Sequence, residues 1–249
     1  MVTIKRNLDV YKNIGIFMKR SKINKEIETA KKLFDSIGFK LPPFTFWTTK
    51  EWMQKGKEVD EIVENMLGWD VTDYGCNQFD KTGLLLFTIR NGNNAKNKKY
   101  PKTYAEKLMV SKESQVAPMH FHWKKKEDII NRGGGDLVIV LHKATTAEEL
   151  SDAPLHASID GVRIKITAGQ KIILKPGESI FIEPFIYHSF YARKNTGSVV
   201  IGEVSQVNDD ENDNRFLDAI GRFPTIEEDE KPIHLLCTEY TKWMKHLPS

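Results

Sequence analysis

The sequence is poor in cysteine: its 249 residues include two, Cys76 and Cys237. Two distant cysteines form neither a disulfide framework nor a zinc cassette, and they suit a reducing compartment. Apolar runs are short, and none approaches the roughly 18–20 residues that cross a bilayer. The first residues, MVTIKRNLDVYKNIGIF, lack the apolar core and small-residue cleavage site of a signal peptide. We therefore expect a cytoplasmic, soluble, single-domain protein.

A large charge of one sign is also missing. Lys and Arg total 37 against 34 for Asp and Glu, which leaves a formal net charge of +3. These charges are interspersed, whereas a nucleic-acid-binding domain carries a basic patch or stripe. Hydrophobic residues make up 40% of the chain and aromatic residues 10%, an ordinary globular composition that argues against disorder. The composition thus points to neither a nucleic acid nor a membrane as partner.

The first third of the chain has a helical pattern. Apolar residues recur at spacings of three and four over Ile23–Ile37, and Gly38 supplies a left-handed stop. A second helix is expected to begin at Thr48, whose partner in a capping box is Glu51, and to end at Leu67. The large apolar faces of these helices predict that they pack on a sheet.

From Leu84 onward the apolar period changes to two, which predicts short strands separated by turns. Short strands at this spacing are typical of a β-sandwich or barrel and not of a parallel α/β sheet. Ala95–Lys102 is expected to form a solvated lysine-rich loop, and short helices are expected at Arg215–Gly221 and near Tyr240–His246. The expected strands are Leu84–Arg90, Thr103–Val110, Val116–His122, Leu137–His142, Val162–Thr167, Lys171–Leu174, Ser179–Glu183, His188–Ala192 and Val199–Val204.

The segment PMHFHWKKKED, which begins at Pro118, carries the strongest chemical signal. Side chains two residues apart on a strand point to the same face, so His120 and His122 project together. Glu127 follows after a polar bend. Two imidazoles and a nearby carboxylate are ligands that a borderline divalent cation prefers. His188 opens a later strand, and the joint pattern predicts a metal site.

The spacing His120-x-His122-x4-Glu127-x6-Gly134 resembles the first motif of the cupin superfamily. Gly169-x6-Pro176-Gly177, continuing to His188, resembles the second motif, with Glu183-Pro184 in place of the usual Pro-x-Gly. Within the cupins, the segment HFHWKKKEDIINRGGG from His120 onward is similar to the sequences of the D-lyxose ketol-isomerase family. The similarity continues through Glu203-Val204-Ser205, Asn208-Asp209-Asp210 and Asp213-Asn214-Arg215-Phe216 to Phe223-Pro224 and the acidic run Glu227–Glu230.

This resemblance implies a mainly β fold, a cupin-type β-barrel (double-stranded β-helix, or jelly roll) with the N-terminal helices packed on it. We expect one cupin domain over residues 1–249, with an N-terminal helical extension at 1–80, the barrel core at 81–207 and a C-terminal cover at 208–249. The resemblance also implies one divalent metal ion, usually manganese, although the ligand types leave cobalt, nickel and zinc open. The implied metal ligands are His120, His122, Glu127 and His188.

Members of the family interconvert D-lyxose with D-xylulose and D-mannose with D-fructose. Such a reaction needs a Lewis acid for the developing enediolate oxygen and a base that moves a proton between C2 and C1. Three neutral imidazoles and one carboxylate leave a divalent ion about one positive charge, which counts for more in a partly dry barrel than in water. A monosaccharide is therefore the expected partner of the chain.

Two residues are candidates for the base. Glu203 lies in an apolar strand, where burial without a partner is unfavourable, so its place favours the metal cavity over an outward, solvated position. If desolvation dominates there, the pKa of this carboxyl is raised, which suits a base near neutrality. Lys125 is the second candidate, or a donor to a sugar oxygen. Asp210, Asp213 and Arg215 are expected either to contact the polyol or to form a solvated acidic loop.

Two alternatives remain open at this point. Three histidines and a glutamate also hold iron or copper in cupin dioxygenases. A sugar-binding or regulatory cupin would keep the metal and the polyol contacts without turnover. We expect a homodimer, because cupins often pair through their sheets.

Overall fold

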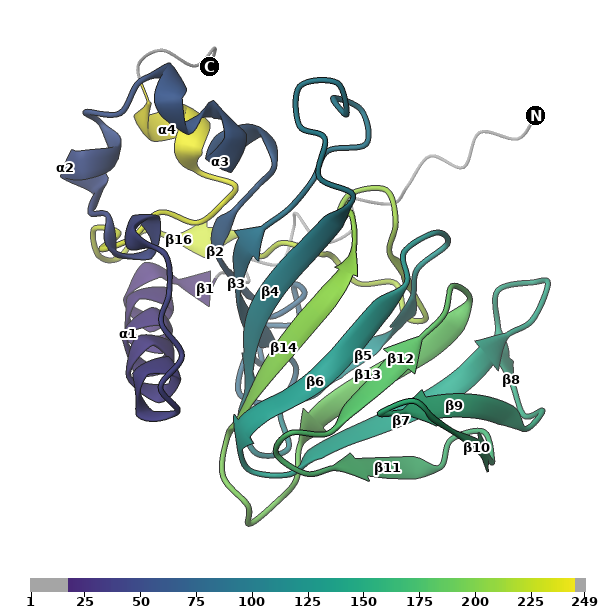
Figure 1. The fold of residues 1–249 in the computed structure, drawn as a ribbon. Helices are drawn as coiled ribbons and strands as arrows, with labels where there is room; N and C mark the ends of the chain where they lie inside the picture. The colour runs from purple at the N-terminus through teal and green to yellow at the C-terminus, as the bar shows by residue number, and fades with distance from the viewer. Residues whose placement is uncertain (1–17, 245–249) are drawn as a thin grey trace.

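The computed structural model describes residues 18–244, and strands dominate this part of the chain. Figure 1 shows the strands gathered into two curled sheets, with the helices together to one side of them. The predicted mainly β fold is confirmed. The expectation about a signal peptide concerns residues 1–17, which lie outside the described residues, as does the end of the helix expected at Tyr240–His246.

The larger sheet has eight strands, and every neighbouring pair in it is antiparallel. In spatial order the strands are β10 (Val162–Ile166), β9 (Leu155–Ile159), β12 (Ser179–Ile182), β6 (Glu127–Gly134), β14 (Val199–Gln206), β4 (Tyr104–Ser111), β3 (Leu84–Arg90) and β2 (Gly68–Thr72).

The smaller sheet has six strands and is also antiparallel. Its order is β11 (Lys171–Leu174), β7 (Leu137–Ala144), β13 (Ile186–Ala192), β5 (Ala117–Phe121) and β15 (Arg215–Phe216), with β8 (Leu150–Ser151) paired to β7. A separate parallel pair joins β1 (Met18–Lys19) to β16 (Ile226–Glu227).

Strand β3 shows how the apolar pattern builds two cores. Leu84 and Leu86 belong to the core between the sheets, whereas Leu85 and Phe87 belong to the core beneath helix α1 (Arg20–Ser36). Successive side chains of a strand point to opposite faces, so a strand covered on both sides is apolar throughout. The prediction that the N-terminal helices pack on a sheet is confirmed for α1.

The second predicted helix is broken. It forms α2 (Thr49–Trp52), a 3₁₀ turn at Lys57–Val59 and α3 (Asp60–Glu64), and a further 3₁₀ turn lies at Pro43–Phe46. The capping box of Thr48 and Glu51 is present. The break falls at Met53–Gly56, where glycine is a poor helix former. Packing supports the shorter pieces, because the Trp52 ring lies 4.5 Å from Tyr240 at the start of α4 (Tyr240–Trp243).

Two further differences affect the site. The prediction of a helix at Arg215–Gly221 is wrong, because this segment begins with β15, which pairs with β5. Strands β2, β6, β8 and β9 were not among the expected strands, although the hairpin at Asp160-Gly161 does join β9 to β10.

Residues 95–102 form a loop, as expected. None of the helices within residues 18–244 is long and apolar enough to span a membrane.

Candidate metal and active site

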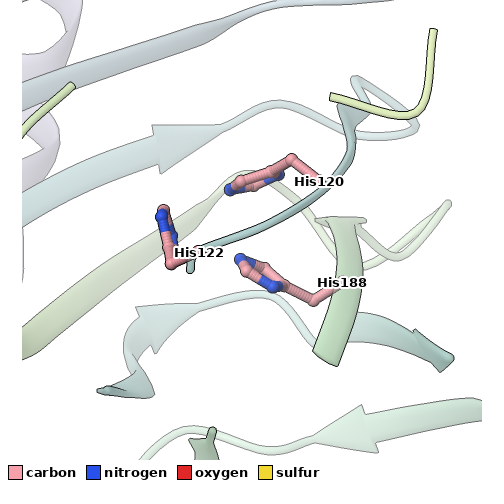
Figure 2. Close-up of side chains that lie close together, drawn as sticks. All are labelled: His120, His122 and His188. Carbon is pink, nitrogen blue, oxygen red and sulfur yellow. The ribbon is translucent and has the colours of Figure 1, made fainter. Parts of the chain in front are cut away.

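A cavity lies between the two sheets, and its polar lining comes from both. His120 on β5 and His188 on β13 are direct cross-strand partners, and His122 follows the end of β5. One ring nitrogen of each histidine lies within 4.8 Å of the others. Figure 2 shows the three imidazoles directed into one space. The histidines that the sequence singled out are therefore brought together from two strands and a loop.

Backbone carbonyls orient all three rings. His120 Nδ1 lies 2.8 Å from the carbonyl oxygen of Pro118, and His188 Nδ1 lies 3.1 Å from that of Ile186. His122 Nδ1 bonds in the same way to the Asp213 carbonyl. A carbonyl only accepts, so each Nδ1 carries the proton and each Nε2 keeps a lone pair for a ligand.

Burial keeps two of these rings neutral. The burial of His120, together with the neighbouring rings of His188 and His122, holds its pKa well below the usual value. Burial and the Lys125 ammonium likewise lower the pKa of His122. Neutral imidazoles are the form that binds a metal.

Glu127 on β6 faces these nitrogens. Its Oε1 lies 3.0 Å from His188 Nε2 and 3.5 Å from His122 Nε2, is fully buried and has no hydrogen-bond donor. Ring nitrogens of the three imidazoles therefore lie close together, and the Glu127 carboxylate faces two of them. Such a set is unfavourable unless a cation lies at its centre. Nitrogen and oxygen donors of this kind fit a borderline divalent ion.

Beside these groups lies a buried chain of charges. Lys125 Nζ lies 2.7 Å from Glu127 Oε2 and 2.9 Å from Glu203 Oε1. Lys107 Nζ lies 3.4 Å from the same oxygen of Glu203, to which the Ser205 hydroxyl donates at 3.0 Å. Side chains alternate between the two faces of β14, so Glu203 lies on the same face as Val199 and Ile201. This face is directed into the core between the sheets. Glu203 therefore lines the cavity.

The ammonium groups set the protonation of this chain. Burial alone raises the pKa of Glu203, but Lys107 and Lys125 outweigh it and leave that pKa below its usual value. The condition for a raised pKa is therefore not met: burial is the largest single effect, but the two lysines together outweigh it. Burial by itself lowers the pKa of Lys125, yet Glu127 and Glu203 raise it overall, so this lysine stays charged.

The segment after β14 covers the cavity and brings in residues that the sequence analysis missed. Arg222 lines the cavity, and its Nη2 lies 2.7 Å from Asp70 Oδ2 on β2 and 3.3 Å from Asp210 Oδ2. Lys107 Nζ lies 4.0 Å from Asp210 Oδ1. Asp70 is an ionisable residue inside the buried strand β2, which is the same signal that singled out Glu203, whereas Lys107 directly follows Glu106 on β4.

Two expected polyol contacts have other partners. The Asp213 carboxylate accepts hydrogen bonds from the backbone amides of Lys124 and Lys125, at 3.0 and 2.9 Å. Arg215 pairs with Phe121 across β15 and β5, so its side chain lies on the face of the sheet away from the cavity, where its Nε lies 3.1 Å from Glu148 Oε2. Its neighbour Phe216 faces the cavity instead, 5.4 Å from the His120 ring.

A family model described as D-lyxose isomerase matches residues 18–240. The chain belongs to the D-lyxose isomerase family. It is 46% identical over 228 residues to a D-lyxose/D-mannose isomerase of Serratia proteamaculans, which covers 91% of this chain and all of that protein. It is 47% identical over 227 residues to a D-lyxose/D-mannose isomerase of Escherichia coli O157:H7, with the same coverage.

Solved structures show the fold of this D-lyxose isomerase family member. The L-ribose isomerase of Geodermatophilus obscurus superposes with a TM-score of 0.58 at 16% identity, over 85% of this chain and 99% of that one. The L-ribose isomerase of Acinetobacter sp. DL28, in complex with L-ribose, gives 0.57 at 16% identity with the same coverage. The predicted cupin-type barrel is confirmed, because the two curled sheets of this chain match the fold of these sugar isomerases.

Proposed function

We propose that this chain is an aldose–ketose isomerase that interconverts D-lyxose with D-xylulose and D-mannose with D-fructose, with the help of one divalent metal ion. The relatives named D-lyxose/D-mannose isomerase align over their whole length, which supports a sugar isomerase. One structural observation carries the mechanism: three imidazole nitrogens and a carboxylate oxygen gather directly beside a buried carboxylate–ammonium pair.

His120, His122, His188 and Glu127 would hold the metal ion. When bound, the ion supplies positive charge that stabilises an oxyanion on the sugar. We propose manganese, with cobalt, nickel and zinc as the alternatives that the test compares, since imidazole and carboxylate donors accept all of them.

Glu203 is the proposed base that takes the proton from C2 of the aldose and returns it to C1. The proton of the C2 hydroxyl moves to O1 in the same reaction, and we assign this second transfer to other polar side chains of the cavity. The lowered pKa of Glu203 keeps it ionised at neutral pH. Because its pKa is raised, Lys125 stays protonated and suits a hydrogen-bond donor better than a base. We assign it a hydrogen bond to a sugar oxygen. The 2.9 Å contact between the two would hold the base beside the donor.

Lys107, Asp210 and Arg222 are the proposed contacts to the remaining hydroxyls. Each already has a partner of opposite charge within 4.0 Å. A cavity whose charges are paired in this way suits an uncharged polyol better than a phosphorylated sugar. We do not extend this role to Asp213 and Arg215, because their side chains bond elsewhere.

The proposal also covers the cellular location, the oligomeric state and the division of the chain into parts. The absence of a disulfide framework supports a cytoplasmic location. A homodimer follows from the tendency of cupins to pair through their sheets, and light scattering after size-exclusion chromatography tests it. The division into an extension at 1–80, a core at 81–207 and a cover at 208–249 stays a prediction, and β2 shows that the extension contributes a strand to the larger sheet.

A panel of aldoses tests the function. The full chain is assayed with each aldose under anaerobic conditions, before and after chelation, and again after add-back of each metal separately. We expect conversion of D-lyxose and D-mannose, its loss on chelation and its best recovery with Mn²⁺. Strict dependence on oxygen and ferrous iron would support a dioxygenase instead. Sugar binding without exchange of the C2 proton in deuterated water would support a cupin without turnover.

A further inference from the structure

The strands that carry the histidines have a reverse face, directed away from the cavity. Phe121 lies between His120 and His122, and Tyr187 precedes His188, so their side chains point the other way. The Phe121 ring lies 4.8 Å from the Tyr187 ring and 5.6 Å from that of Trp123. An aromatic layer of Phe121, Trp123 and Tyr187 thus backs the wall that holds the imidazoles.

Glu148 bonds to two members of this layer. Its Oε1 accepts the Trp123 indole N–H at 2.8 Å, and its backbone oxygen accepts the Tyr187 hydroxyl at 2.6 Å. The second carboxylate oxygen accepts Arg215 Nε at 3.1 Å. These three bonds join one residue of the turn between β7 and β8 to three separate segments of the chain.

Each of the three partners is next in sequence to a residue of the cavity. Trp123 follows His122, Tyr187 precedes His188, and Arg215 precedes Phe216. A shift of any partner on the outer face therefore moves a ligand or a lining residue on the inner face, because neighbouring residues of a strand share one backbone.

The turn that carries Glu148 is itself held in an unusual conformation. Glu148 has φ +60°, in the left-handed region that a glutamate rarely adopts. Its amide donates to the Thr145 carbonyl, and the amide of Thr145 donates to the Glu149 carbonyl. Such a backbone persists when the surroundings over-determine it, and here it aims the carboxylate at Trp123 and Arg215.

We propose that Glu148 is a positioning residue of the metal centre, which fixes His122, His188 and the cover strand β15 from outside the barrel wall through Trp123, Tyr187 and Arg215. This inference rests on the proposed metal-dependent function. It assigns no contact with the sugar or the metal ion to Glu148.

Binding of Mn²⁺ alone tests the inference, measured by titration calorimetry on the full chain. Glu148→Ala removes both side-chain bonds, and we expect Mn²⁺ to bind about threefold to tenfold more weakly, less than the 10- to 100-fold typical of losing a residue that bonds a metal ligand directly. Glu148→Gln keeps the volume, and its amide satisfies one of the two donors, so its dissociation constant should lie between those of wild type and Glu148→Ala. The control Glu149→Ala alters an exposed residue of the same turn and should bind like wild type.

A double-mutant cycle separates positioning from general loss of stability. Arg215→Met deletes one partner, and combining it with Glu148→Ala should weaken Mn²⁺ binding by less than the product of the two single effects, because both remove the same bond. Wild-type affinity in Glu148→Ala and Glu148→Gln, with a lowered melting temperature alone, would assign Glu148 a structural role and overturn the inference while the proposed function stands. A wild-type chain that binds no Mn²⁺ would overturn the proposed metal, and this inference with it.

Discussion

The two walls of the cavity present different chemistry. The wall from the smaller sheet and its adjoining loop carries three imidazoles, each oriented by a backbone carbonyl. The wall from the larger sheet carries Lys107, Glu127 and Glu203, whose orientation depends on one another and on Lys125. Glu127 belongs to both, since one oxygen faces the histidines and the other faces Lys125.

This difference separates binding from proton transfer. A backbone carbonyl does not titrate, so each ring keeps the tautomer with its proton on Nδ1, and burial keeps His120 and His122 neutral. Ionisable partners, in contrast, make the protonation of Glu203 depend on its neighbours. Changes to the histidines or to Glu127 should therefore remove the metal, whereas changes to Lys107 or Glu203 should alter catalysis while the metal stays bound.

Loss of a histidine should have the largest effect. His188→Ala removes a ligand, so Mn²⁺ affinity should fall by more than about 100-fold, given that losing a residue that only orients a ligand already costs 10- to 100-fold. Activity should fall with it, while circular dichroism still reports a folded barrel. His156→Ala, at an exposed position of β9, is the matched control. Retention of both metal and activity would remove His188 from the site.

Glu203→Gln tests the other wall with a near-isosteric change. Removal of a general base should lower kcat by about 10²- to 10⁴-fold. Mn²⁺ and sugar binding should stay close to wild type, because the amide oxygen can still accept from Lys125. Glu183→Gln, at an exposed site, controls for the substitution itself. Turnover near the wild-type rate would move the base to Lys125 or Asp210.

Asp213→Asn should have an intermediate effect. The amide oxygen can replace one of the two carboxylate bonds to the backbone of Lys124 and Lys125, and the carbonyl bond to His122 is kept. We expect kcat/KM to fall by roughly tenfold, the size of one lost hydrogen bond to a charged group. Asp209→Asn in the same segment should change little. Equal losses in both variants would contradict a role specific to Asp213.

Lys107→Met should change the pH dependence of kcat, and it should also raise KM, because Lys107 is a proposed contact to a sugar hydroxyl. Burial raises the pKa of Glu203, but the two lysines together lower it by more, so the net pKa lies below its usual value. The base therefore loses activity only as the pH falls through that lowered pKa. Without Lys107 the pKa rises, and the acidic limb of the kcat profile should move to higher pH. Exposed Lys126→Met should leave the profile in place. An unmoved limb in Lys107→Met would show that another group controls it.

How much could be predicted depended on the range of the interaction. The spacing of His120, His122 and Glu127 predicted side chains that lie together, because a strand and a short bend fix their relative positions. Arg215 was misplaced because its side of the sheet depends on the pairing of β15 with β5, a long-range contact without a local signal. The lowered pKa of Glu203 depends on Lys107, a partner on another strand that the sequence does not place beside it.

Periodicity and the chemistry of single side chains are local properties, and they predicted the kinds of element, the apolar faces that bury them and the residue types that bind a divalent ion. Which charges meet depends instead on the pairing of distant strands. Register across the strands joins Lys107 to Glu203 and turns Arg215 outward toward Glu148, because a shift by one residue reverses the face on which each side chain lies.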